Sequence, residues 1–484
     1  MNAPVRRLSI VVILMFFALM GATTWVQYGQ ASALNDDPRN TRTIYREYGR
    51  DRGPIVVAGE PVASSTAVED PFGFQRTYAN GPLYAPVTGY FSVVFQMTGV
   101  ERAANDVLNG TDESLLLSRV RSLFTGGQQQ GGTVELTIDP AVQQAAWDAL
   151  GDQRGAVVAL DPSTGAILAL VSKPSFDPNA LAGHSTADVN AAYQGLLADA
   201  NRPMENRAIS GRLYAPGSTF KLVDLAMLLE SGSYSPDTQV PAPVEFPLPG
   251  SSAVIQNAGG VPCTNEDTVT LMYALQESCN TPFASLGVEF GGDALRTQAE
   301  AFGFGQDLQI PLTVTPSVFP AQLDAAQTAM SAIGQYDVRV TPLQMAMVSA
   351  AVANNGAIMT PYLIATERGP NLQVTSTTSP SEWATPISAT TASLMRDMMV
   401  NVVQNGTGYP AQISGVQVAG KTGTAESGTA AAPNAWFTAF APADNPQVAV
   451  AVVVEAGGDL GNEATGSRVA APIARTVIQA VLDR

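Results

Sequence analysis

Ser218 and Lys221 lie three residues apart in the segment YAPGSTFKLV, a spacing that can support nucleophilic catalysis. Pro216 and Gly217 break the preceding structure, and the apolar residues that follow predict a buried helix that ends near Gly232. Both side chains would then share one face of the first helical turn, where free N–H groups stabilise a developing oxyanion. Burial would lower the pKa of the Lys221 amine, so that it could accept the Ser218 proton.

Lysine is rare in this chain, which makes its positions informative. Three of the 25 basic residues are lysines, Lys173, Lys221 and Lys421, and the other 22 are arginines. Arginine stays protonated and cannot act as a base, so a position that needs a base must keep lysine. Ser-x-x-Lys alone is a weak signal, because three lysines give a chance match in about one chain in five.

Two further motifs strengthen the signal. Ser278-Cys279-Asn280 follows the helix-like stretch LMYALQE, and Lys421-Thr422-Gly423-Thr424 lies where a strand is expected. Ser-x-x-Lys, Ser-x-Asn and Lys-Thr-Gly, in this order, are the motif set of penicillin-binding proteins and class A β-lactamases. A chance occurrence of all three in order is below roughly a few per cent.

Composition argues against several other kinds of site. A net charge of −17 and a pI near 4.4 argue against a nucleic-acid partner, because phosphate binding needs basic patches. His184 is the single histidine, so a histidine-based metal site cannot be assembled, and a Ser-His-Asp triad would have to use this residue. It lies in the polar stretch AGHSTAD, which indicates an ordinary surface residue. We expect neither a metal nor a cofactor.

The N-terminus predicts a membrane anchor. Arg6 and Arg7 precede the uncharged stretch Leu8–Val26, whose length matches a hydrocarbon core of about 30 Å. The basic residues would place the N-terminus in the cytoplasm and the bulk of the chain outside it. The alternative is a signal peptide cleaved after Ala31-Ser32-Ala33, although the apolar stretch would be long for one and the cleavage site lies well past its end.

Hydrophobic patterning predicts a mixed fold after the Gly/Gln tract Thr125–Thr133, which we interpret as a linker or exposed loop. Val134–Leu150 predicts a strand and then an amphipathic helix that starts at an Asp-Pro pair. Apolar runs on either side of short turns predict two β-hairpins, at residues 155–171 and 434–455, and a helix follows at Ala470–Leu482. The expected α/β (α+β) architecture is a central antiparallel sheet covered by helices.

The chain resembles class B penicillin-binding proteins, the D,D-transpeptidases of bacterial cell-wall synthesis. The resemblance extends beyond the motifs to LTIDPAVQQAAWDAL, GAVVALDPSTGAILALVSKPSFDPN, NRAISGRLYAPGSTFK, IGQYDVRVTPLQMAMVSAAVANNG and GKTGTAE, and the short N-terminal region with GPLYAPVTGYFS is similar to the compact actinobacterial penicillin-binding protein A. It implies a cytoplasmic tail at residues 1–7, an anchor at 8–26, a non-catalytic pedestal or dimerisation-like domain at 27–132 and a serine β-lactamase/transpeptidase-like domain at 133–484.

The resemblance also implies a role for each motif residue. Ser218 would be the nucleophile that accepts the acyl group, and Lys221 its base. Ser278 would relay a proton towards the leaving D-alanine, and Asn280 would hold the substrate amide. Lys421 would supply positive charge near the terminal carboxylate of the stem peptide.

The Lys-Thr-Gly strand and the cysteines carry further expectations. Thr422 and Thr424 would contact substrate, the N–H groups of Ser218 and Thr424 would form the oxyanion hole, and Gly423 would let the strand approach the substrate closely. The two cysteines, Cys263 and Cys279, lie outside the predicted membrane segment, so a disulfide is permitted; two free buried thiols are the alternative.

The implied activity is the cross-linking of peptidoglycan stem peptides ending in D-Ala-D-Ala, through an acyl-serine and with release of D-alanine; β-lactams would acylate the same serine. About 100 residues before the catalytic domain are too few for a glycosyltransferase. Glycan polymerisation would then need a membrane-bound polymerase of the division or elongation machinery as a partner, and the family favours a role in division.

Four other functions stay open. A β-lactamase is disfavoured because residues 307–332 contain no glutamate, whereas class A enzymes carry their deacylating glutamate in a loop after the Ser-x-Asn element. A D,D-carboxypeptidase would use water in place of an amine acceptor. A β-lactam sensor would be expected to have several spans and a cytoplasmic output region, and a scaffold could keep the motifs without the activity.

Overall fold

The computed structural model describes residues 3–30, 48–112, 130–426 and 432–484. Helix α1 (Ala3–Thr24) runs into the π-helical turn Trp25–Gly29. Within the stretch from Pro4 to Gly29, a window of 18 residues has a mean hydropathy of 2.2 and none of it is buried, so the stretch is long and apolar enough to cross a membrane. The alternative cleavage site at residues 31–33 lies outside the described residues.

The central sheet has five strands in the order β19-β20-β21-β7-β8, all antiparallel. The strands are β7 (Gly155–Leu160), β8 (Ile167–Lys173), β19 (Ala419–Ala425), β20 (Asn434–Ala441) and β21 (Val448–Val454). Both predicted hairpins, β7–β8 and β20–β21, are therefore confirmed, and β21 joins them by pairing with β7. Strand β19 lies at the edge of the sheet and pairs only with β20 among the described strands.

Helices cover both faces of this sheet, because alternate side chains of each strand point to opposite sides. Ala156 and Val158 of β7 join the larger core with α11 (Lys221–Glu230) and α16 (Pro342–Ala353). Val157 and Ala159 join a second core with α8 (Pro140–Leu150) and α18 (Ala471–Leu482). Helix α8 begins as predicted, with Asp139 accepting hydrogen bonds from the N–H groups of Ala141 and Val142.

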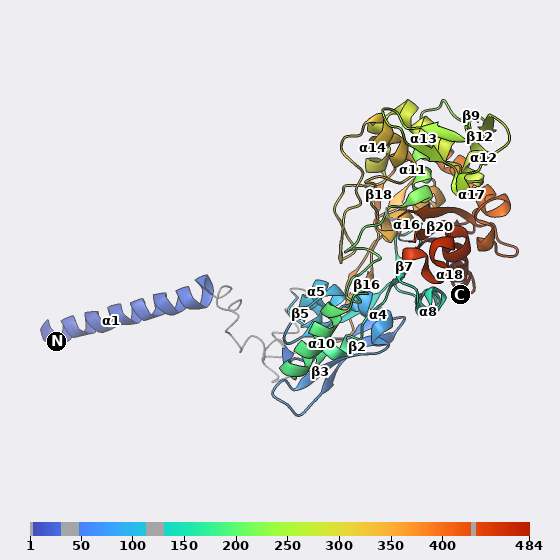
Figure 1. The fold of residues 1–484 in the computed structure, drawn as a ribbon. Helices are drawn as coiled ribbons and strands as arrows, with labels where there is room; N and C mark the ends of the chain where they lie inside the picture. The colour runs from blue at the N-terminus through green and yellow to red at the C-terminus, as the bar shows by residue number, and fades with distance from the viewer. Residues whose placement is uncertain (1–2, 31–47, 113–129, 427–431) are drawn as a thin grey trace.

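The remaining helices of residues 133–484 lie at both ends of the molecule, with α10 beside the N-terminal sheet (Figure 1). Figure 1 shows α12, α13 and α14 at the end farthest from the N-terminal sheet. The other helices of residues 133–484 are α9 (Asn179–Ala182), α10 (Thr186–Ala198), α12 (Leu271–Gln276), α13 (Asn280–Phe290), α14 (Gly292–Ala301), α15 (Ala325–Ala332) and α17 (Ala389–Asn405).

A second sheet of six strands, in the order β17-β16-β6-β1-β2-β3, forms the N-terminal part of the body. Its strands are β1 (Ile55–Val57), β2 (Glu60–Ala67), β3 (Phe74–Tyr78), β6 (Thr133–Leu136), β16 (Ile364–Arg368) and β17 (Val374–Thr377). Strand β1 pairs with β6 in parallel, and the other neighbours are antiparallel. The sheet thus collects strands from both sides of residue 133, where sequence patterning changes. The predicted linker lies largely outside the described residues, and its last residue, Thr133, opens β6.

Charged residues are buried inside this N-terminal part. The Glu101 carboxylate accepts hydrogen bonds from Arg52 Nε at 2.6 Å and from Arg76 Nε at 2.7 Å. The Tyr78 hydroxyl donates to the same carboxylate at 3.0 Å. We call Arg52, Arg76, Tyr78 and Glu101 the arginine cluster. Because each buried charge in it has an opposite charge at hydrogen-bond distance, the cluster can stay ionised away from water.

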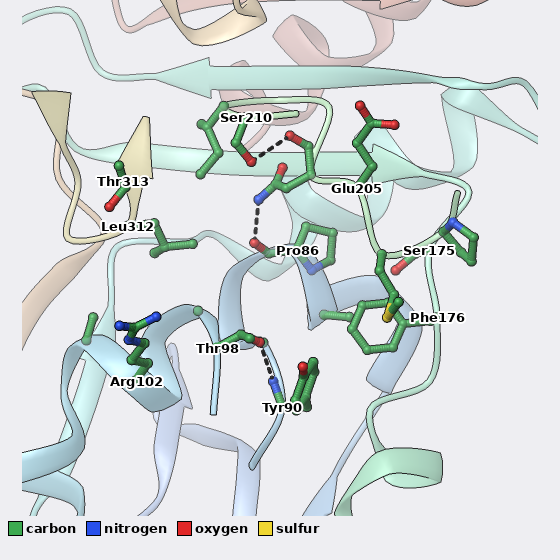
Figure 2. A pocket seen from close by; sticks show the side chains of 18 of the residues that line it. Pro86, Tyr90, Thr98, Arg102, Ser175, Phe176, Glu205, Ser210, Leu312 and Thr313 are labelled. Carbon is green, nitrogen blue, oxygen red and sulfur yellow. Dashed lines mark hydrogen bonds between the residues drawn. The ribbon is translucent and has the colours of Figure 1, made fainter. Parts of the chain in front are cut away.

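A cavity of about 740 Å³ lies where the N-terminal part meets the catalytic half (Figure 2). Its walls include α4 (Gly81–Thr88), α5 (Gly99–Ala103), residues 203–210 and the turn at Pro311–Thr313. Asn206 Nδ2 donates to the Pro86 carbonyl at 2.7 Å along one wall. None of the predicted motif residues lines this cavity, so its size does not locate the catalytic site.

His184 is half-buried and lies in a contact between the two parts of the chain. Its Nδ1 is bonded to the Asp70 carboxylate, and its ring lies 4.4 Å from that of Phe72, centroid to centroid. These partners belong to the β2–β3 connection, far along the chain from Ser218. The only histidine therefore pairs with Asp70 of the N-terminal part and does not form a triad with the predicted nucleophile.

Candidate active site

The predicted nucleophile lies on a short turn that packs against the edge strand of the central sheet. Ser218 belongs to a 3₁₀ turn, Gly217–Phe220, and Lys221 opens α11 directly after it, so the single predicted helix is divided into two pieces. Helix α11 is buried, as its composition predicted. Gly217 has a φ of +53°, and a Cβ at this position would lie 2.6 Å from the carbonyl oxygen of Thr424. Glycine is required because the turn and the strand approach so closely.

The three motifs meet at Ser278. Lys221 Nζ donates to the Ser278 carbonyl at 2.7 Å and to Asn280 Oδ1 at 2.8 Å. Lys421 Nζ donates to Ser278 Oγ at 2.6 Å and to the Thr422 carbonyl at 2.9 Å. No hydrogen bond joins Ser218 to Lys221 in the described part of the chain, although Ser218 immediately precedes the turn of helix that carries the lysine. The fold thus brings together residues from three separate parts of the sequence.

Ser278 has the backbone conformation that this convergence needs. It connects α12 to α13 with a φ of +58°, a left-handed conformation that non-glycine residues rarely adopt and that costs about 1–3 kcal/mol. In this conformation its carbonyl accepts from one lysine and its hydroxyl from the other. The next residue, Cys279, is joined to Cys263 by a disulfide, with Cα atoms 5.7 Å apart.

Burial shifts the pKa values of the ionisable groups around Ser278. Burial, and secondarily the charge of Lys421, holds the pKa of Lys221 well below its ordinary value, against the attraction of the Asp224 carboxyl. Burial alone lowers the pKa of Lys421 from 10.5 to about 7. Burial raises the pKa of Asp224 well above its ordinary value, with Lys221 opposing the shift. The neutral form of each group is therefore favoured relative to water.

A neutral Lys221 amine has hydrogen-bonding capacity that suits a base. Such an amine carries two N–H bonds and one lone pair. Its two N–H bonds are taken up by the Ser278 carbonyl and Asn280 Oδ1, which leaves the lone pair free to accept a proton. In the same way, Ser278 Oγ accepts from Lys421, so its own O–H is left to donate.

The Lys-Thr-Gly segment forms β19. A Cβ on Gly423 would lie 2.9 Å from the Pro216 carbonyl and 2.9 Å from Thr219 Cγ2, so this glycine allows the strand to approach the turn that carries Ser218. The expected close approach of this strand to substrate stays a prediction. Thr422 Oγ1 pairs with Thr407 Oγ1 at 2.8 Å, and Thr424 Oγ1 accepts from the Gly466 N–H at 3.4 Å.

Sequence reasoning missed three side chains that surround the motifs. Asp224 is fully buried on α11, and an acidic residue inside the apolar run KLVDLAMLL was a usable signal. Glu455 follows the apolar strand β21 and accepts from the Tyr214 hydroxyl at 2.8 Å, just before the nucleophile's turn. Asn257 accepts from the Asn280 N–H at 2.7 Å, and its loop offered no pattern by which it could be singled out.

Comparisons with known proteins agree with this geometry. The family described as "Penicillin binding protein transpeptidase domain" matches residues 155–479, and "Penicillin binding protein A dimerisation domain" matches residues 52–134. The chain is 46% identical over 491 aligned residues to the peptidoglycan D,D-transpeptidase PbpA of Mycolicibacterium smegmatis, with 100% of this chain and 99% of the relative covered. It is 45% identical to the PbpA of Mycobacterium tuberculosis, with the same coverage of 100% and 99%.

Solved structures show the same similarity in three dimensions. The ceftriaxone acyl-enzyme complex of penicillin-binding protein A from M. tuberculosis superposes with a TM-score of 0.87 at 45% identity, covering 90% of this chain and 100% of that one. PBP2 of Pseudomonas aeruginosa superposes with a TM-score of 0.73 at 30% identity, covering 89% and 95%. The predicted fold class and the predicted enzyme class, a class B D,D-transpeptidase, are confirmed. This chain belongs to the penicillin-binding protein transpeptidase family.

Proposed function

We propose that this protein cross-links peptidoglycan stem peptides through an acyl-enzyme formed on Ser218. The observation that carries the proposal is the convergence on Ser278 of two buried lysines, Lys221 and Lys421, from the first and third motifs. Two lysines held 2.7 and 2.6 Å from one serine, without a carboxylate hydrogen-bonded to either among the described residues, would be costly in a purely structural core. Such an arrangement is typical of a site that moves protons.

The proposed acylation begins when the Lys221 lone pair takes the proton of the Ser218 hydroxyl. The Ser218 oxygen then bonds to the carbonyl carbon of the penultimate D-alanine, and the peptide C–N bond breaks. The Ser278 hydroxyl, held by Lys421, passes a proton to the nitrogen of the leaving D-alanine and takes up the proton that Lys221 received, so both groups return to their starting states. An amine of a second stem peptide then attacks the ester carbonyl, which forms the cross-link and returns the proton to Ser218.

Substrate would bind along the free edge of β19. An edge strand presents unpaired N–H and C=O groups, so an extended peptide can add to the sheet there. Lys421 would attract the terminal carboxylate of the donor peptide. Asn280 Nδ2 donates one of its two N–H bonds to the Gln256 carbonyl, so the other is available for a substrate amide. The N–H groups of Ser218 and Thr424 would hold the oxyanion.

The apolar helix α1 would anchor the enzyme as a single span, with Arg6 and Arg7 in the cytoplasm and the catalytic domain outside the membrane. We further propose that residues 27–132 form a pedestal domain, that residues 133–484 form the catalytic domain, and that a membrane glycosyltransferase of the division machinery supplies the glycan strands. The match of residues 52–134 to a dimerisation domain supports the proposal that this N-terminal region is not catalytic.

Labelling with a fluorescent penicillin tests the acyl-serine. We expect the full chain to be labelled and the Ser218→Ala variant to lose labelling completely, whereas Ser331→Ala, at a buried serine outside the motifs, keeps it. Incubation with a stem peptide ending in D-Ala-D-Ala plus an amine acceptor should then give the cross-linked product. Release of D-alanine without cross-linking would indicate a carboxypeptidase, and labelling of Ser218→Ala would overturn the proposal.

A further inference from the structure

Asn257 lies outside the three motifs, yet its side chain holds the backbone at the start of α13. Asn257 is buried, and its Oδ1 accepts hydrogen bonds from the N–H groups of Asn280 at 2.7 Å and Thr281 at 3.2 Å. Its Nδ2 donates to Thr281 Oγ1 at 3.4 Å. Cys279, the N-cap residue of α13, makes no side-chain capping bond. The helix is therefore capped by a residue from another segment of the chain.

The residue before Asn257 fixes the Asn280 side chain. The Gln256 carbonyl accepts from Asn280 Nδ2 at 2.8 Å, which turns the opposite side of the amide, Oδ1, towards Lys221. Lys221 Nζ donates to this oxygen at 2.8 Å. Together, Gln256 and Asn257 hold both the main chain and the side chain of Asn280.

The segment that carries Asn257 has several other attachments. Strand β11 (Val254–Gln256) pairs with β10 (Glu245–Pro247), and Cys263 is bonded to Cys279. Thr281 is fully buried, and its hydroxyl donates to the Pro243 carbonyl at 2.7 Å. Because these attachments do not involve the Asn257 side chain, its removal should free the Asn280 N–H and loosen Asn280, while the segment and the rest of the first turn of α13 stay attached.

We propose that Asn257 is a positioning residue for acylation: it holds the Asn280 amide oxygen on Lys221 and, through Lys221, acts on Ser218. This inference rests on the function proposed above and adds a residue that touches neither substrate nor the reacting atoms. The Asn280 oxygen occupies one of the two N–H bonds of the neutral Lys221 amine, so it sets the direction of the lone pair. If Asn280 shifts, the lone pair turns away from Ser218 and proton transfer slows.

The Asn257→Ala variant of the full chain, in detergent, tests the proposal. Time courses with a range of fluorescent penicillin concentrations separate the acylation rate constant from the noncovalent dissociation constant. We expect the rate constant per folded molecule to fall about tenfold or more, as for one lost hydrogen bond to a charged or reacting group, while the dissociation constant changes less than about twofold. Thr270→Ala is the matched control: it removes the N-cap of α12, which accepts from the Tyr273 N–H, and should cost stability without slowing acylation.

Two more variants keep the outcome decisive even if Asn257→Ala folds poorly. Asn257→Asp keeps an oxygen that can accept both N–H bonds and should restore most of the acylation rate. In an Asn280→Ala background, Asn257→Ala should cause no further loss, because both residues act through one amide oxygen. An unchanged acylation rate in Asn257→Ala, or an equal loss in the Asn280→Ala background, would overturn the inference. Absence of labelling in the wild type would instead count against the proposed function itself.

Discussion

Two of the regions in which this molecule buries charged side chains hold them in opposite ways. In the arginine cluster, Glu101 is fully buried, and both of its oxygens accept from arginines at 2.6 and 2.7 Å. At the active site, Lys221 and Lys421 are equally buried, but their hydrogen-bond acceptors are carbonyl, amide and hydroxyl oxygens. The first arrangement stabilises permanent charges, and the second favours loss of a proton.

The difference follows from the chemistry of the two basic side chains. A guanidinium cannot lose its proton under physiological conditions, so a buried arginine must be paired with a carboxylate. An amine can lose its proton, so a buried lysine without a carboxylate partner becomes neutral and available as a base. Lysine is rare in this chain, and two of its three lysines lie where an amine that can lose its proton would be useful. In the arginine cluster, by contrast, the more common arginine keeps its charge and pairs with a carboxylate.

The largest expected effect on acylation comes from replacing the Lys221 amine with a guanidinium that cannot lose its proton. In Lys221→Arg the base would be permanently protonated, so acylation by a fluorescent penicillin should slow by roughly 100- to 10,000-fold. Lys173→Arg is the control, because Lys173 Nζ donates to the Gly151 carbonyl at 2.6 Å and lies 3.9 Å from the Trp147 ring centroid, contacts that a guanidinium can also make. Normal acylation by Lys221→Arg would show that this amine is not the base.

Removing the carboxylate of the arginine cluster should cost stability instead. Glu101→Gln keeps the shape of the side chain but leaves Arg52 and Arg76 without a counter-charge, so the free energy of unfolding should fall by about 3–5 kcal/mol. Urea titration of the full chain would measure this change. Glu135→Gln, at the half-exposed pair with Arg368 at 3.2 Å, should cost no more than about 1 kcal/mol. Equal losses of unfolding free energy in Glu101→Gln and Glu135→Gln would show that the buried carboxylate contributes no more to stability than the half-exposed one.

Replacing Lys421 should raise the free energy of unfolding, whereas replacing Glu101 should lower it. The folded state holds its pKa at about 7, against 10.5 ordinarily, so the unfolded chain binds more protons between these values and the free energy of unfolding rises with pH there. Below about pH 7 the full cost of burying the charge is present. Lys421→Met should therefore be about 1–3 kcal/mol more stable than the wild type at pH 6, net of its lost hydrogen bonds, with the difference shrinking by pH 9.

Unfolding of the Lys421→Met variant at the two pH values would measure the difference. The same variant should be acylated more slowly, because Ser278 Oγ loses its donor. A stability difference that does not depend on pH would show that the wild-type lysine is not shifted.

The smallest effect is expected at Asp224, whose carboxyl oxygens make no hydrogen bond among the described residues. Burial raises its pKa, so below the ordinary value of 3.8 the carboxyl is neutral in both the folded and the unfolded chain, and Asp224→Asn should change the free energy of unfolding there by less than about 1 kcal/mol. A raised pKa in the folded state means that the folded protein is most stable, with respect to this group, below the ordinary value of 3.8. This contribution to the free energy of unfolding is lost as pH rises through the folded pKa. The variant should therefore gain stability relative to the wild type at higher pH.

Melting temperatures of Asp224→Asn and the wild type between pH 3 and 9 would test this expectation. Asp293→Asn, at an exposed acid paired with Arg296, should show no such trend. A loss of about 3 kcal/mol or more in Asp224→Asn near neutral pH would indicate a charged pair with Lys221 instead.

The sequence by itself determined the candidate site residues and most of the central sheet. Ser-x-x-Lys, Ser-x-Asn and Lys-Thr-Gly were recognisable because each motif is local, and the β7–β8 and β20–β21 hairpins because their strands are joined by short turns. The helix α8 was predictable from its Asp139 cap, and the anchor from its uncharged length. These features depend on neighbours in the chain, so periodicity and turn chemistry suffice to find them.

The tertiary structure alone decided how distant segments meet. Lys421 bonds to Ser278 across a separation of 143 residues, and β16 joins the N-terminal sheet beside β6. Asn257 caps a helix that begins 23 residues later. No local pattern encodes such pairings, because they arise when a whole core closes. The pKa of a lysine likewise depends on how completely that core excludes water, so the capacity of a lysine to act as a base depends on folding and not on its neighbours in sequence.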